Sequence, residues 1–139
     1  MITTFDIDEM MYRLLVDAGI GFAIEGGIYH QGGRPTDSDV EDIVINHISL
    51  TMDVIPQTAV TNVNIYVPDD KLNLGGRVMA MANENRLKQL SEIVMDAINR
   101  QPVKGVVFRI ENMSVLEEPS IEQHYANIRV YWTIAIYQH

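Results

Sequence analysis

The stretch GGIYHQGGRP, residues 26–35, carries two glycine pairs six residues apart and an arginine, which are residue types found in phosphate-binding loops. Such a loop must end in Gly-Lys-Ser/Thr and lead directly into a helix. Here it is followed by TDSDVEDIVI, which has four carboxylates, no lysine and the alternation of a strand. The glycine spacing of a dinucleotide-binding turn is also missing. We therefore expect both glycine pairs to supply positive φ angles at turns around a short strand.

The acidic residues that follow resemble the start of a calcium loop, because Asp37, Asp39 and Glu41 stand at alternate positions. The sixth position of such a loop must be glycine and is Asp42, and the twelfth must be glutamate and is Ile48. A solvated hairpin loop is therefore the expected structure.

The histidines are His30, His47, His124 and His139, and no two of them have the four-residue spacing of a helical zinc site. His30 and His47 could meet across neighbouring strands, but a metal site would need a third ligand that the sequence does not indicate. Cysteine is absent, and so is the Gly-x-Ser-x-Gly motif of serine hydrolases. We expect no catalytic residues, no cofactor, no metal and no enzymatic activity.

Two segments have the periodicity of amphipathic helices. In residues 6–18, apolar residues recur every three or four positions, with Asp6 as the expected N-cap and Gly19 as the stop. In residues 83–100, Asn83 or Asn85 can cap the start and Pro102 ends the pattern. The expected buried stripes are Ile7, Met10, Met11, Leu14, Leu15 and Ala18 in the first helix, and Leu87, Leu90, Ile93, Val94, Ala97 and Ile98 in the second.

Five segments alternate with period two and predict strands: residues 28–31, 43–52, 60–68, 105–119 and 128–137. The alternation slips near residues 46–47, which predicts a β-bulge in the segment 43–52. It slips again at residue 112, which predicts a phase change in the segment 105–119. Trp132 is expected to be buried with Val130 and Ile134, under the second helix. The predicted fold is a single α+β domain, residues 1–139, with an antiparallel-dominated sheet of four to five strands and two main helices on one face.

Residues 69–82, DDKLNLGGRVMAMA, make a longer connection than the usual two to six residues between strand and helix. Their apolar side chains need a partner. One interpretation is an irregular cover over the domain's own core. The other is a loosely packed arm, hinged at Gly75–Gly76, that contacts a neighbouring subunit. The candidate interface residues are Leu72, Leu74, Arg77, Val78, Met79 and Met81.

The formal net charge of −9 disfavours non-specific binding to DNA or RNA, because such a chain repels phosphates at long range, and we expect no sequence-specific nucleic-acid binding. No apolar run approaches the roughly 20 residues that a membrane helix requires. Asp6, Asp8 and Glu9 occupy the region where a signal peptide carries positive charge, so we expect no secretion by that route. The lack of cysteine suits a reducing cytoplasm.

The order of the expected elements resembles the bacteriophage tail-terminator and tail-completion proteins, the minor tail protein U-like group. The segments that carry the resemblance are MYRLLVDAG, GGIYHQGGRP, EDIVINHISL, VNIYV, NRLKQLSEIVMDAI and NIRVYWTIAIY, which together extend over nearly all of the chain. The segment 69–82 is longer than the family pattern.

The resemblance implies a structural protein of a virion or prophage. Its subunits would form a homo-oligomeric ring, typically a hexamer, that caps the tail tube and meets the head connector. Tail-tube and head-connector proteins would be its partners, and it would be cytoplasmic in the bacterial host during assembly and then part of the virion tail. The alternative from the residues alone is a small soluble α+β ligand-binding or regulatory domain without a phage role.

Overall fold

Five strands form the main sheet of the protein, whose computed structural model describes residues 1–135. The strand order across the sheet is β1-β2-β3-β7-β6. β1 and β2 are parallel, and the other neighbours are antiparallel. The strands are β1 (Ile28–His30), β2 (Asp42–Leu50), β3 (Gln57–Pro68), β6 (Val106–Glu118) and β7 (Gln123–Ile134).

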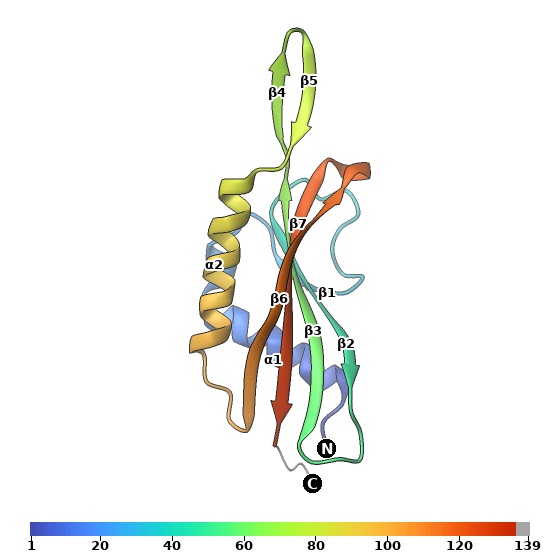
Figure 1. Ribbon diagram of the computed structural model, residues 1–139, viewed down its shortest axis with the longest axis vertical. Helices are drawn as coiled ribbons and strands as arrows, with labels where there is room; N and C mark the ends of the chain where they lie inside the picture. The colour runs from blue at the N-terminus through green and yellow to red at the C-terminus, as the bar shows by residue number, and fades with distance from the viewer. Residues whose placement is uncertain (136–139) are drawn as a thin grey trace.

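The two helices, α1 (Thr4–Asp17) and α2 (Glu84–Arg100), pack on one face of this sheet (Figure 1). Two short 3₁₀ turns, η1 (Ile20–Phe22) and η2 (Pro119–Ile121), complete the main body. A separate two-stranded sheet, β4 (Asp70–Leu74) and β5 (Arg77–Met81), projects from one end. The predicted α+β class with mostly antiparallel strands is confirmed.

The core lies between the helices and the sheet and forms one continuous cluster of apolar side chains. Trp132 is fully buried there, with Val130 and Ile134 on the same face of β7, as the alternation predicted. The Trp132 and Phe108 rings form a T-shaped pair at a centroid distance of 4.7 Å, and Trp132 Nε1 donates to Thr61 Oγ1 at 2.9 Å. The indole therefore buries its large apolar surface without leaving its N–H unpaired.

The helix ends differ in part from the sequence predictions. α1 is capped by Thr3 instead of Asp6: the Thr3 hydroxyl accepts from the Asp6 backbone N–H, and the Asp6 carboxylate accepts from the Thr3 N–H at 2.7 Å. Asp6 thus closes a capping box from the third helical position. Gly19 ends the helix in a left-handed conformation, as expected, and Asn83 caps α2.

Some residues predicted to share the buried stripe or strand face are exposed. On α2, Ile93 is exposed while Ser91 is buried. The β2 bulge lies between His47 and Ser49, close to its predicted place, but Ile48 and Met52 remain about half exposed. Leu50, in the same phase, is partly buried against the core, so only part of the predicted face is covered.

The remaining strand predictions are confirmed with changed limits. β3 begins at Gln57, earlier than its apolar alternation indicated, and Val63, Ile65 and Val67 face the core. β6 shifts register between Ile110 and Asn112, at the predicted phase change. β7 begins at Gln123 and ends at Ile134. The predicted end of that strand and His139 fall within residues 136–139, outside the described residues.

Candidate assembly interface

The segment that stood out by its length, residues 69–82, is a regular antiparallel hairpin. Leu72 lies opposite Met79, and Leu74 lies opposite Arg77. The two-residue turn consists of Gly75 and Gly76, with φ angles of 59° and 84°. Both central positions of a type I′ turn require positive φ, which glycine adopts without strain.

The sequence does contain the signal for this hairpin, a Gly-Gly pair between two alternating apolar runs. Sequence reasoning missed it because the connection was judged by its length, and the irregular backbone expected of a core cover is wrong. The interpretation as a loosely packed arm that contacts a neighbouring subunit stays a prediction.

The hairpin has one predominantly apolar face. Because directly opposite residues point to the same side of a two-stranded sheet, one face carries five of the six predicted interface residues and the other carries Val78. The five are Leu72, Leu74, Arg77, Met79 and Met81. Every residue of β4 and β5 is exposed, and the apolar side chains on this face keep 42–59% of their surface accessible.

This exposure contradicts the interpretation of residues 69–82 as a cover over the domain's own core. An isolated two-stranded hairpin is marginally stable in water, and three or more strands or a packed face are needed to stabilise it. The hairpin therefore presents a surface that a partner would stabilise.

The base of the hairpin is attached firmly to the body. The Asp69 backbone N–H donates to the Glu122 carbonyl at 3.0 Å, and the buried Asp69 carboxylate contacts His124 Nδ1 at 2.6 Å. Lys71 pairs with Glu122 at 3.3 Å, but both side chains are exposed, so this pair contributes little. The hairpin is thus held at its root and projects freely beyond it (Figure 1).

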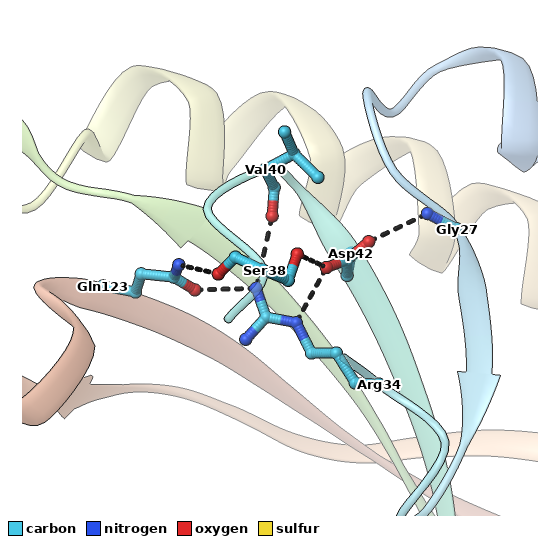
Figure 2. Close-up of polar contacts among 6 residues, drawn as sticks. All are labelled: Gly27, Arg34, Ser38, Val40, Asp42 and Gln123. Carbon is cyan, nitrogen blue, oxygen red and sulfur yellow. Dashed lines mark hydrogen bonds and ion pairs between the residues drawn. The ribbon is translucent and has the colours of Figure 1, made fainter. Parts of the chain in front are cut away.

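The arginine of the glycine-rich stretch is used within the protein. Figure 2 shows the guanidinium of Arg34, a residue of the loop 31–41, between Asp42 and Gln123. Arg34 Nε donates to Asp42 Oδ2 at 2.8 Å, and its Nη2 donates to the Val40 carbonyl at 3.2 Å and to Gln123 Oε1 at 2.8 Å. Its guanidinium also lies 4.3 Å from the centre of the Tyr66 ring. These contacts tie the loop to β2, β3 and β7 and occupy the Nε and Nη2 donors of Arg34 within the protein.

Asp42 is the acceptor at the centre of this network. Its side chain is 1% exposed and accepts hydrogen bonds from the Gly27 N–H at 2.9 Å, from Arg34 and from the Ser38 hydroxyl. Burial alone would raise the pKa of this carboxyl. The hydrogen bonds from Ser38, Gly27 and Arg34 and the charge of Arg34 outweigh that effect, so the pKa of Asp42 is lowered.

The prediction that both glycine pairs of this stretch supply positive φ angles is correct for one glycine only. Among the four glycines of the stretch, only Gly32 has a positive φ, of 84°. Gly26 is required by close approach, since a Cβ there would collide with the Asp42 carboxylate and the Glu41 carbonyl. This requirement comes from a residue sixteen positions away, so turn statistics could not show it.

The acidic cluster and the histidines are also used in structural contacts. Glu41 is buried and holds Arg86 of α2 through two hydrogen bonds, of 2.5 and 2.8 Å, while Asp37 and Asp39 are exposed. Hydrogen bonding to Glu41 raises the pKa of Arg86.

His47 Nδ1 contacts Asp8 at 2.8 Å and His30 lies 4.0 Å from Glu9, so each histidine faces α1 instead of the other. Within residues 1–135 there is no group of three or more metal-ligating side chains of the His, Cys, Asp or Glu type. No helix in the described part of the chain is long and apolar enough to cross a membrane.

A scan against models of known protein families and a search of curated proteins each gave no match to this chain. The candidate site is therefore defined by the fold itself: the apolar face of the β4–β5 hairpin, with Arg77 at its tip.

Proposed function

We propose that this protein is a structural subunit that assembles with copies of itself into a ring, and that the ring caps a phage tail tube and meets the head connector. The observation that carries the assembly is the exposed apolar face of a hairpin anchored only at its root. Soluble proteins rarely leave such a contiguous apolar surface without a partner.

A ring needs a heterologous interface, in which one surface of a subunit contacts a different surface of the next. A projecting hairpin suits this geometry, because it reaches beyond its own domain and cannot bury its apolar face there. The net charge of −9 also suits a channel through which DNA must pass without being held. The tail tube and head connector as partners follow from the resemblance in the order of elements, and so does assembly in the host cytoplasm before incorporation into the tail.

The experiment replaces residues 71–80 with a short Gly-Ser link and compares the product with a control, Asn73→Ala, that is changed only on the opposite face of the hairpin. Native mass spectrometry and electron microscopy report assembly, with and without purified tail tubes. Urea unfolding reports stability. We expect the shortened protein to fold nearly as well as the wild type, since surface loops tolerate such changes, and to form no rings, while Asn73→Ala assembles normally.

Two results would count against the proposal. A shortened protein that still forms rings and caps tubes shows that the hairpin does not carry assembly. A wild type that neither self-associates nor binds tubes shows that the structural role itself is wrong.

A further inference from the structure

A groove of about 580 Å³ lies between α2 and the later part of β6. Its apolar lining comes from Leu87 and Met95 on the helix and from Met113 and Val115 on the strand. After the register shift at Ile110 to Asn112, Met113 and Val115 lie opposite Ile128 and Ala126, on the side of the sheet that carries the core. They are nevertheless 41% and 49% exposed, because α2 does not cover this part of β6.

A side-chain hydroxyl and a strand edge beside the groove both lack hydrogen-bond partners within the described residues. Ser91 lines it, and the buried Ser91 hydroxyl has no hydrogen-bond partner within residues 1–135. β6 is the last strand in the order of the main sheet, so its outer edge is not paired with another strand of the described chain. A free strand edge beside an apolar groove is a surface to which an extended segment can add.

The hairpin has the properties that this groove requires. Its apolar face carries leucine and methionine side chains of the kind that line the groove. On this face Arg77 lies next to the turn and the one carboxylate, Asp70, lies at the root. The groove carries Glu84 and Glu92 against one lysine, so the charge near the tip of the hairpin is opposite to the net charge of the groove. Exposed charges of this kind are screened by salt, but they favour one orientation of docking.

The hairpin cannot enter the groove of its own chain. Its root lies beside the groove, where Asp70 and Met81 adjoin Glu84 and Glu117, and its tip points away from the body (Figure 1). A groove that can receive the tip therefore belongs to another copy.

We propose that the β4–β5 hairpin of one subunit docks in the α2–β6 groove of the next, with Leu72, Leu74 and Met79 against Met95, Met113 and Val115. This inference rests on the proposed self-assembly and identifies the two surfaces that meet. Since the surfaces differ, each subunit gives one contact and receives one, and such a head-to-tail contact forms a closed ring when the rotation between neighbouring subunits closes.

The test uses one variant for each surface. Leu72→Asp places a charge on the hairpin face, and Val115→Asp places one in the groove. Val107→Asp is the matched control, because Val107 is an exposed valine on the same strand before the register shift, with its side chain outside the groove. All three residues are at least 42% exposed, so folding should be retained. Native mass spectrometry measures the number of subunits.

We expect each of the first two variants to be monomeric, with at least a tenfold weaker association, and the control to assemble like the wild type. An equal mixture of Leu72→Asp and Val115→Asp should stop at a complex of one copy of each. In this mixture Val115→Asp keeps an intact hairpin and Leu72→Asp keeps an intact groove, so each pair of subunits can form a single contact.

If Val115→Asp assembles as strongly as the wild type, the hairpin does not dock in the groove. The proposed ring would still stand, because the hairpin would then dock elsewhere. If neither Leu72→Asp nor Val115→Asp weakens assembly, the hairpin does not dock in the groove, and the proposal that the hairpin carries ring assembly is also wrong.

A second measurement applies if the wild type is monomeric in solution. The chain has no cysteine, so Leu74→Cys and Val115→Cys can be mixed and oxidised without competing thiols. We expect a disulfide-linked heterodimer, and none when Val107→Cys replaces Val115→Cys. Absence of the Leu74–Val115 crosslink would overturn the docking proposal, whereas its formation by a protein that makes no ring would uphold the contact and refute the ring.

Discussion

Replacing Asp42 with asparagine tests whether the polar network that joins the residue 31–41 loop to Asp42 and Gln123 stabilises the fold (Figure 2). The substitution keeps the shape of the side chain but removes its charge and replaces one acceptor oxygen with an NH₂ donor. Asp42 accepts from both Gly27 and Arg34 Nε, so in the variant at least one of these N–H groups faces another donor.

The expected cost is about 3 kcal/mol. Removing one partner of a buried ion pair usually costs about 3–5 kcal/mol. We take the lower end because Arg34 is 11% exposed and keeps its hydrogen bonds to Val40 and Gln123. With an unfolding entropy of about 2.1 cal/mol/K per residue over 139 residues, this cost lowers the Tm by about 10 °C.

The effect also depends on pH, with a defined sign. Because the pKa of Asp42 is lowered in the folded protein, its contribution is fully present above the ordinary value of 3.8 and is lost as the pH falls through the lower folded value. The difference in the free energy of unfolding between wild type and Asp42→Asn should therefore shrink as the pH drops below 3.8.

The assay is urea unfolding followed by the fluorescence of Trp132, the single tryptophan, which is fully buried. Asp39→Asn is the control, since Asp39 is an exposed carboxylate in the same loop and should change stability by less than about 0.5 kcal/mol. Equal stability of the two variants at neutral pH, or a wild-type advantage that persists unchanged in acid, would refute the reasoning.

Three further changes follow from the packing. Trp132→Ala should lower the free energy of unfolding by about 3–5 kcal/mol, as large core truncations do; a loss below about 1 kcal/mol in urea unfolding would contradict the burial of this ring. Gly26→Ala should cost about 3 kcal/mol, the upper end for overpacking, because its Cβ meets the Asp42 carboxylate; normal thermal stability would show that the approach is not tight. Replacing Gly75 and Gly76 together with valine should disrupt the turn and weaken assembly, while Trp132 fluorescence reports unchanged unfolding of the main body; rings of wild-type strength would show that the turn geometry is dispensable.

The sequence by itself determined the features that depend on neighbouring residues. The period of residues 128–134 and of residues 63–67 specifies which side chains of β7 and β3 face the core, because strand side chains alternate regardless of what covers them. The α2 stripe and its Asn83 cap are equally local, and the phase changes located both bulges to within two residues. The candidate interface residues were also identified from the sequence, as apolar side chains in a segment too long for its connection.

Tertiary structure decided whatever depends on distant parts of the chain. Gly26 is needed because Asp42 approaches it, and Arg34 is occupied because Gln123 lies beside it across the sheet. Ile93 is exposed although it fits the predicted stripe, and Ser91 is buried on the face that contacts the rest of the protein. The groove beside β6 exists because α2 covers only part of that strand. Periodicity shows which way a side chain points, but only packing between distant segments decides whether anything lies in that direction.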